Sequence, residues 1–317
     1  MPDTPWRSYG KIISYNSDLN GDGFDDLVVS APNAGYFRTG KVYIYFGGNQ
    51  INTQPDVTLN GEDYYYEWDQ LEFGQKISTA SDFNGDGYHD LVISSLAWGW
   101  GQVNVFFGGP QFDTISDWVK TGNMYDFLGY ELSAGDFNGD GYDDLLIVSA
   151  INGGSLYTLQ IFYGNASFDT TEDWETTLLF GGLKYVFLNQ DINRDGFTDI
   201  FIKNPAPILN FCWGAQEPSS VFESIPGLEF NFTKLYFSLL SDSLYITADS
   251  YQSNQVFCYR YNQDSGLISD YHINEAYNPN GVFCISYYLG DINGDGNTEI
   301  LLGSMAQNQA QLKVFTT

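Results

Sequence analysis

The chain has 317 residues, and its 12 Lys and Arg against 40 Asp and Glu give a formal net charge of −28. Such a composition excludes a nucleic-acid-binding or anionic-membrane-binding protein, because no basic patch is present to neutralise phosphates. No run of about twenty apolar residues occurs, so the sequence predicts no membrane-spanning helix and no membrane insertion. Aromatic residues make up 17% of the chain, which favours strands and binding surfaces.

A nine-residue acidic loop recurs five times along the chain, beginning at residues 18, 82, 136, 191 and 291. Each copy has oxygen-bearing side chains at positions 1, 3, 5 and 9, a carbonyl available at position 7, and glycine at position 6, where a positive φ is expected. This is a ligand set for calcium, which takes six to eight oxygens in loose geometry. We therefore predict about five calcium ions. The predicted ligands are Asp18, Asn20, Asp22, Phe24, Asp26, Asp82, Asn84, Asp86, Tyr88, Asp90, Asp136, Asn138, Asp140, Tyr142, Asp144, Asp191, Asn193, Asp195, Phe197, Asp199, Asp291, Asn293, Asp295, Asn297 and Glu299.

The spacing of the loops predicts a sixth repeat that has lost its loop. Successive loops begin 64, 54, 55 and 100 residues apart, and the last interval is two periods. A copy is therefore expected near residue 241. There, residues 237–248 read as two strands joined by a turn too short to hold a metal.

Each repeat has the same order of elements. A glycine-led strand comes first, then the acidic loop, a second strand of Leu, Ile and Val, a third strand that ends in an aromatic residue and glycine, and a more polar fourth strand. Four short strands in a period of roughly fifty residues predict an all-β fold, a β-propeller with one four-stranded blade per repeat.

We predict a single propeller domain over residues 1–317, with six blades whose repeats begin near residues 9, 73, 128, 183, 232 and 281. The last repeat lacks a fourth strand, and residues 3–8 resemble the fourth strands of earlier repeats. We therefore expect these residues to complete the last blade and close the ring, which removes exposed strand edges. Seven blades are the alternative, but they need about fifty more residues.

These repeats resemble the FG-GAP, or integrin α-chain type, repeat family over nearly the whole chain. The resemblance rests on Phe73-Gly74, Leu128-Gly129, the five acidic loops, residues 30–32 (Ser-Ala-Pro) and the third strand that begins at Gly40. It implies calcium in the hairpin between the first two strands of a blade and ligand recognition on the opposite face. Integrin propellers have seven blades, so a count of six departs from the family. Arg194 also replaces the glycine at position 4 of the fourth loop.

Two roles for the calcium are open: a staple for a tight hairpin, or the centre of a ligand-binding site. The staple is favoured, because the loop supplies most of the ligands that one ion takes and recurs around the ring, whereas a catalytic site would appear once.

Aromatic residues concentrate in the connections at the opposite ends of the strands. The candidates for ligand binding are Tyr36, Phe37, Tyr65, Trp68, Trp98, Trp100 and Tyr125. Either these rings pack beneath the loops, or they form a platform on which a sugar or a protein binds.

Among function classes, the sequence favours a calcium-stabilised extracellular binding or adhesion module for a carbohydrate or a protein, and not an enzyme. No recognisable catalytic motif is present, and His89 and His272 read as structural. A polysaccharide-active glycosidase or lyase built from paired carboxylates is one alternative, and a passive domain of a larger surface protein is another. Fold resemblance alone does not transfer integrin function.

We expect a monomer that is secreted or displayed on a bacterial cell surface, and whose N-terminal leader was removed, since calcium loops of this open kind favour the high calcium outside cells. Cys212, Cys258 and Cys284 lie in apolar strands, where buried thiols are expected. One bridge between Cys212 and Cys258 is the alternative.

Overall fold

The structure is a computed structural model in which the chain divides into two compact units, described here one at a time. It describes residues 8–49, 52–61, 71–96, 99–178, 185–191, 193, 195–203 and 209–224, and beyond these the backbone of the strands between residues 234 and 316. The first unit comprises Met1–Asn189, Gly196–Asn204 and Phe211–Phe222, and the second comprises Gln190–Asp195, Pro205–Asn210 and Glu223–Thr317.

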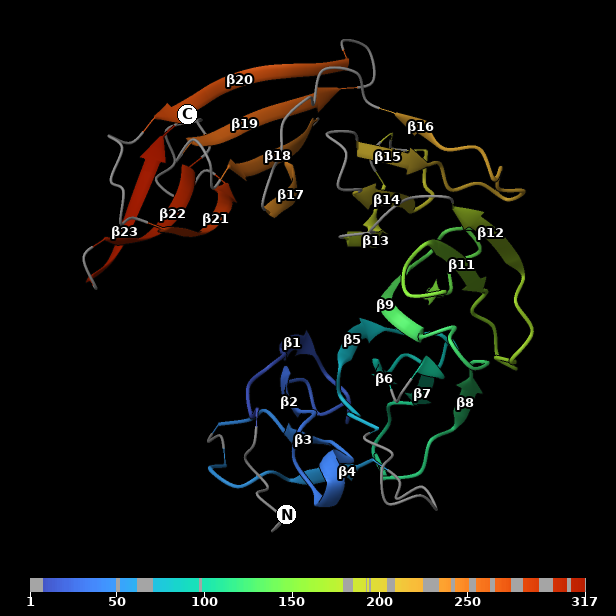
Figure 1. Cartoon of the computed structure of the whole chain (residues 1–317). Coiled ribbons are helices and arrows are strands. Elements are labelled where there is room, and N and C mark those ends of the chain that lie inside the picture. Colours follow the sequence, from blue (N-terminus) through green and yellow to red (C-terminus); the bar gives the residue numbers. More distant parts are fainter. Residues whose placement is uncertain are drawn as a thin grey trace. The chain divides into compact units, whose positions relative to one another are not determined.

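Three four-stranded sheets make up most of the first unit (Figure 1). The first sheet contains β1 (Ile13–Ser17), β2 (Asp26–Ala31), β3 (Lys41–Tyr45) and β4 (Val57–Asn60). The second contains β5 (Lys76–Ser81), β6 (Asp90–Ser95), β7 (Gln102–Phe106) and β8 (Trp118–Thr121), and the third contains β9 (Leu128–Gly135), β10 (Asp144–Ile151), β11 (Leu156–Phe162) and β12 (Trp174–Leu178). Within each sheet, strands adjacent in sequence pair antiparallel. A short 3-10 helix, η1 (Tyr36–Arg38), lies between β2 and β3.

A fourth sheet follows the same strand order. It contains β13 (Tyr185–Gln190), β14 (Asp199–Lys203), β15 (Leu209–Cys212) and β16 (Glu223–Ser224).

The second unit contains two further antiparallel sheets. One contains β17 (Lys234–Leu240), β18 (Ser243–Ser250), β19 (Gln255–Asn262) and β20 (Gly266–Asn274); the other contains β21 (Val282–Gly290), β22 (Glu299–Ala306) and β23 (Gln309–Thr316). Leu240 pairs with Ser243, so only positions 241 and 242 separate β17 from β18. The fifth repeat therefore has the short turn that its sequence predicts.

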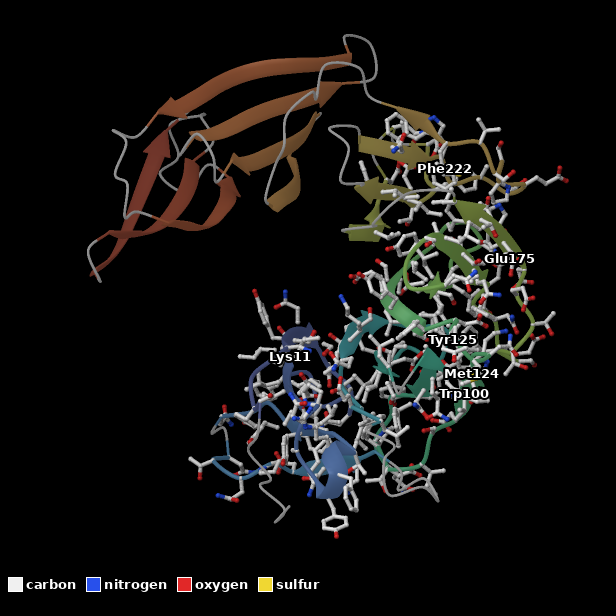
Figure 2. The ribbon with its side chains drawn as sticks, viewed as in Figure 1. Lys11, Trp100, Met124, Tyr125, Glu175 and Phe222 are labelled. Carbon is white, nitrogen blue, oxygen red and sulfur yellow. The ribbon has the colours of Figure 1, made fainter. Side chains whose placement is uncertain are left out.

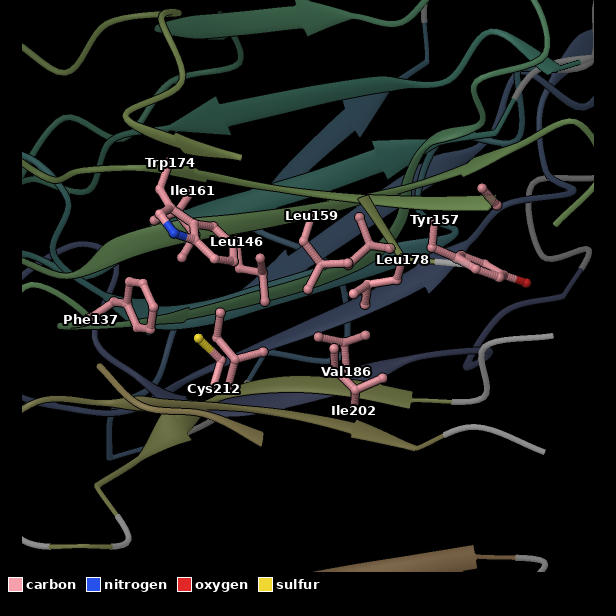
Figure 3. Packing of buried hydrophobic residues seen from close by; sticks show 13 residues of the cluster. Phe137, Leu146, Tyr157, Leu159, Ile161, Trp174, Leu178, Val186, Ile202 and Cys212 are labelled. Carbon is pink, nitrogen blue, oxygen red and sulfur yellow. The ribbon is translucent and has the colours of Figure 1, made fainter. Parts of the chain in front are cut away.

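The core of the first unit lies between neighbouring sheets. Strands β2, β6 and β10 are almost wholly buried, because their continuous runs of Leu, Ile and Val cover both faces of each sheet. Figure 3 shows one such layer, in which Leu146 and Trp174 of the third sheet pack with Val186 and Ile202 of the fourth. A matching cluster joins the second sheet to the third. Each sheet thus buries its faces against its neighbours, as blades of a propeller do.

The prediction of an all-β fold with antiparallel four-stranded sheets is confirmed. The number of blades stays a prediction, as does the single-domain organisation. The proposed closing strand at residues 3–8 falls almost entirely outside the described residues. Within the described part of the chain, no helix has the length and apolar character to span a membrane.

The cysteine prediction can be followed at one position. Cys212 is fully buried, and its Sγ donates to the carbonyl oxygen of Ser219 at 2.9 Å. The side chains of Cys258 and Cys284 lie outside the described residues, so the alternative of a bridge to Cys258 stays untested.

Candidate functional site

The first acidic loop, residues 18–26, joins β1 to β2 and is organised by the carboxylate at its first position. Asp18 Oδ1 accepts backbone hydrogen bonds from Gly21 at 2.7 Å and Asp22 at 3.1 Å, and its Oδ2 accepts one from Gly23 at 2.8 Å. Asn20 Oδ1 in turn accepts the N–H of Asp22 at 2.9 Å. Short polar side chains that bond to nearby backbone groups in this way fix a tight loop without regular secondary structure.

The second and third loops, residues 82–90 and 136–144, repeat this pattern bond for bond. Asp82 receives three backbone N–H groups, and so does Asp136. Because three copies with different neighbouring sequences adopt one pattern, the pattern follows from the residues that the loops share.

The aspartate at position 9 ties each loop to the end of the third strand. Asp90 is fully buried, and its Oδ2 accepts the N–H of Phe83 at 2.8 Å while Oδ1 accepts the N–H of Gly108 at 2.9 Å. Asp26 and Asp144 make the equivalent bonds, to Gly47 and to Gly164. The glycine that ends each third strand is needed for this approach, since a Cβ at Gly108 would collide with the carbonyl oxygen of His89.

Burial sets the protonation of these position-9 carboxyls. It raises the pKa of Asp90 to about 7, and the pKa of Asp144 also to about 7, although backbone N–H donors oppose the shift. The carboxylates of Asp82 and Asp86 raise the pKa of Asp90 further. Burial and the neighbouring carboxylates thus disfavour the charged form of position 9, and a nearby cation would favour it.

Glycines supply the unusual backbone conformations within the loops. Gly21 and Gly23 have φ of 74° and 89°, and the second and third loops have glycine with similar φ at the same two positions. Positive φ is costly for other residues, so the glycines at positions 4 and 6 are conformational requirements.

The residues of these loops fit a calcium ion by their chemistry. Each of the three loops presents three carboxylates and one amide oxygen, and positions 4 to 6 are exposed to solvent. These oxygens are the donors that calcium prefers. In the described residues, however, no group of three His, Cys, Asp or Glu side chains is arranged as a metal site. The carboxylates at positions 1 and 9 instead face backbone N–H groups.

The remaining predicted loops are described less completely. In the fourth loop, Asp195 N–H donates to Asn193 Oδ1 at 3.1 Å, and Gly214 N–H donates to Asp199 at 3.0 Å. Residues 190–195 and 196–204 belong to different units. Of the fifth loop, Asp291, Asn293, Asp295 and Asn297 lie outside the described residues, and Glu299 opens β22.

The opposite ends of the strands have aromatic side chains in their connections. In the first sheet, the segment between β2 and β3 exposes Tyr36 (54%) and Phe37 (38%), whose rings form an edge-on pair with centroids 4.2 Å apart. Phe37 has φ of 54°, the left-handed region that costs a residue with a side chain about 1–3 kcal/mol. The two rings therefore face solvent on a strained backbone.

A second exposed aromatic pair lies between the second and third sheets. Trp100 and Tyr125 are 48% and 56% exposed, and Figure 2 shows them beside the exposed Met124. The segments are joined by Phe127 N–H donating to the Gly99 carbonyl at 3.0 Å and Leu128 N–H donating to that of Trp100 at 3.3 Å. Tyr125 also has a left-handed backbone, with φ of 73°.

The structure thus brings Trp100 and Tyr125 together and leaves Tyr36, Phe37, Trp100 and Tyr125 exposed, while Tyr65, Trp68 and Trp98 lie outside the described residues. Sequence reasoning missed Met124 and the glycines bound by position 9. The aromatic-glycine ending shared by the third strands was the available signal for those glycines.

Comparison with known proteins identifies the repeats. The FG-GAP repeat family matches residues 16–45, 73–105 and 128–159. Phosphatidylinositol-glycan-specific phospholipase D of Mus musculus is 35% identical over 159 residues, which is 46% of this chain and 19% of that protein. Integrin alpha-5 of Xenopus laevis is 30% identical over 148 residues, or 41% of this chain and 14% of the integrin. The chain thus aligns with less than a fifth of each of these relatives.

Among solved structures, the Dos1 propeller matches with a TM-score of 0.54 at 11% identity, covering 95% of this chain and 66% of that one. A likeness at this identity shows the fold alone, which is that of a propeller. The first three acidic loops lie within the matched segments, and the glycines that end their third strands follow shortly after them. Residues 16–45, 73–105 and 128–159 are therefore FG-GAP repeats, and the chain is a relative of the integrin α chains and of phosphatidylinositol-glycan-specific phospholipase D.

Proposed function

We propose that this protein is a calcium-stabilised extracellular binding module that recognises a carbohydrate or a protein through its aromatic connections. The two kinds of loop lie at opposite ends of the sheets, because in an antiparallel meander the first and second connections are on opposite sides. One end holds metal, and the other remains available to a partner.

The observation that carries the proposal is the exposure of Tyr36, Phe37, Trp100 and Tyr125 in the connections at one end of the sheets. Exposed aromatic rings are typical of recognition surfaces, since they bury a large apolar area against a partner at a small cost in side-chain conformational entropy. The left-handed backbone at Phe37 and Tyr125 supports the same reading, because strain of this kind concentrates at functional positions.

Calcium acts as a structural staple in this proposal. About five ions bind in the acidic loops, and each loop stabilises the fold by about 2.7 kcal/mol when calcium stands at a hundredfold excess over its dissociation constant. The loops bond their own backbone and lie away from the aromatic connections, which supports a stabilising role over a place in the ligand site.

The relatives favour a module that is not an enzyme and that works outside the cell. FG-GAP repeats of the integrin type are in general non-enzymatic, and the integrin α chains suggest a protein ligand and a cell-surface or secreted setting. The phospholipase relative shares only a fifth of its length with this chain, so its activity is not carried over.

Ligand screening with a matched pair of variants tests the proposal. The full chain in millimolar calcium is applied to a glycan array and to immobilised extracellular-matrix proteins, beside a Trp100→Ala/Tyr125→Ala variant and a Tyr15→Ala control. Tyr15 is an exposed ring on β1 rather than in a connection. Binding that the double variant loses and the control keeps supports the proposal. Binding that survives in both variants would place the ligand site elsewhere.

A further inference from the structure

Each of the first three acidic loops is covered by an aromatic ring from the following repeat. The Tyr88 ring occupies the space that a Cβ on Gly21 would need, the Tyr142 ring does the same at Gly85, and the Phe197 ring does so at Gly139. In every case position 7 of one loop lies against position 4 of the loop before it. The glycine at position 4 is therefore needed for this contact as well as for its positive φ.

A second contact joins position 8 to position 1 of the preceding loop. Asp18 N–H donates to Nδ1 of His89 at 3.0 Å, and Asp82 N–H donates to Oδ2 of Asp143 at 3.0 Å. The backbone N–H of position 8 returns a bond to the carbonyl of position 1, as from Thr198 to Asp136 at 2.7 Å.

These contacts fall on the groups that hold the first ligand of each loop. Gly21, which lies against the Tyr88 ring, donates its N–H to Asp18 Oδ1. Asp18 is also the residue that hydrogen-bonds to His89 at position 8 of the next loop. The next repeat thus holds the main chain of position 1 directly, and it reaches the carboxylate through Gly21, against which its ring packs. Groups that orient a metal ligand in this way commonly change metal affinity by 10- to 100-fold when they are removed.

We infer that the calcium affinity of each of these three loops is set by positions 7 and 8 of the following repeat: by Tyr88 and His89 for the first loop, by Tyr142 and Asp143 for the second, and by Phe197 and the backbone N–H of Thr198 for the third. The inference rests on the proposed calcium binding. In this inference each calcium site depends on two repeats: one repeat supplies all the ligands, and the next repeat positions them.

The sequence contains a natural test of the same rule. The fifth repeat has no acidic loop, and hence no position-7 ring to cover the fourth loop. Position 4 of that fourth loop is Arg194, whereas the first three loops have glycine there. Position 4 of the fifth loop is Gly294, so the fourth loop, which precedes the repeat without an acidic loop, is the one of the five that lacks glycine there.

Site-resolved calcium titration tests the inference. The full chain is labelled with 15N-glycine, and the position-6 amides of Gly23, Gly87 and Gly141 report on the first, second and third loops by NMR. We expect Tyr88→Ala to raise the calcium midpoint at Gly23 roughly tenfold, although Tyr88 is no ligand of that loop, and Tyr88→Phe to restore it. Tyr15→Ala is the control, because Tyr15 is an exposed ring on β1 that lies outside the acidic loops.

A second pair of variants tests the position-8 contact, which does not involve the aromatic ring at position 7. Asp143→Ala is expected to weaken the second loop, read at Gly87, while Asp143→Asn keeps an oxygen acceptor and the affinity. The exposed Asp25, at position 8 of the first loop, gives the control Asp25→Ala. The inference is wrong if the calcium midpoint at Gly23 shifts no more in Tyr88→Ala than in Tyr15→Ala, and the midpoint at Gly87 no more in Asp143→Ala than in Asp25→Ala. If no reporter responds to calcium in the wild-type chain, the proposed calcium binding itself fails.

Discussion

The two ends of the sheets in the first unit solve the same problem, a tight reversal of the chain, in opposite ways. At the acidic end, every residue with positive φ inside the three nine-residue loops is glycine, and the same hydrogen bonds recur in each copy. At the aromatic end, Phe37, Arg38, Tyr125 and Asn152 adopt left-handed backbone despite their side chains. The acidic end is thus built for stability, whereas the aromatic end retains strain and differs from repeat to repeat, as a recognition surface does.

Removing calcium should have the largest effect, and it tests the difference between the two ends of the sheets because calcium is proposed to bind at the acidic end alone. Chelation should remove about 2.7 kcal/mol for each loop that had been held at a hundredfold excess of calcium. A large fall in melting temperature is therefore expected in EGTA, measured by calorimetry against a sample in millimolar calcium. An unchanged melting temperature in EGTA would show that calcium does not stabilise the fold.

Asp90→Ala separates the loop's own hydrogen bonds from the metal. The substitution leaves the buried N–H of Phe83 and the half-buried N–H of Gly108 without an acceptor, at a cost of about 1–3 kcal/mol for the buried one, and urea unfolding should show this loss even in EGTA. Asp86→Ala is the control, since Asp86 is exposed and should lower stability only when calcium is present. If both variants and the wild type are equally stable in EGTA, the hydrogen bonds of Asp90 do not stabilise the fold, and position 9 acts only as a metal ligand.

The acidic end was largely predictable from sequence because its information is local. Nine consecutive residues specify the loop, and alternation of apolar and polar strands specifies the sheets around it. What the sequence did not show are the bonds that cross repeats: Asp18 and His89 are 71 residues apart, and Asp82 and Asp143 are 61. Nothing in the local pattern of either loop distinguishes position 8 as a connector, since it is Asp25, His89, Asp143 or Thr198.

The aromatic end was predictable only as a cluster of ring-bearing residues. Whether a ring is buried or exposed depends on the neighbouring sheet, which a single sequence does not reveal. Phe127 packs against the core between the third and fourth sheets, whereas Tyr125, two residues earlier, is exposed. Within this one connection, Phe127 thus packs beneath the loop, whereas Tyr125 is exposed and available to a partner.

A reciprocal pair of substitutions sharpens the contrast in backbone strain. Gly23→Ala should destabilise the chain by about 1 kcal/mol, because φ of 89° disfavours any side chain while no atom lies close enough to clash. Tyr125→Gly should relieve strain and leave stability equal or slightly higher, yet weaken ligand binding at least tenfold. Urea unfolding and a binding titration measure both effects. A Tyr125→Gly variant that loses stability but keeps binding would reverse the assignment of the aromatic end.

An ion pair between the first strands of the second and third sheets offers the smallest effect and a test by pH. Lys76 on β5 and Glu131 on β9 form an ion pair at 2.6 Å. Burial nevertheless raises the pKa of Glu131 above its usual 4.5, and Lys76 only partly offsets the shift. The folded chain therefore holds this proton more tightly than the unfolded chain does, so the contribution of Glu131 to stability falls as pH rises from 4.5 through the folded pKa.

Glu131→Gln cannot titrate, so its melting temperature relative to the wild type should increase between pH 4.5 and pH 7 in saturating calcium. Lys76→Gln is the companion variant, which should enlarge the pH-dependent loss by removing the charge that favours the carboxylate. A wild-type minus Glu131→Gln difference that stays constant with pH would mean that the ion pair cancels the effect of burial and that Glu131 titrates alike in both states.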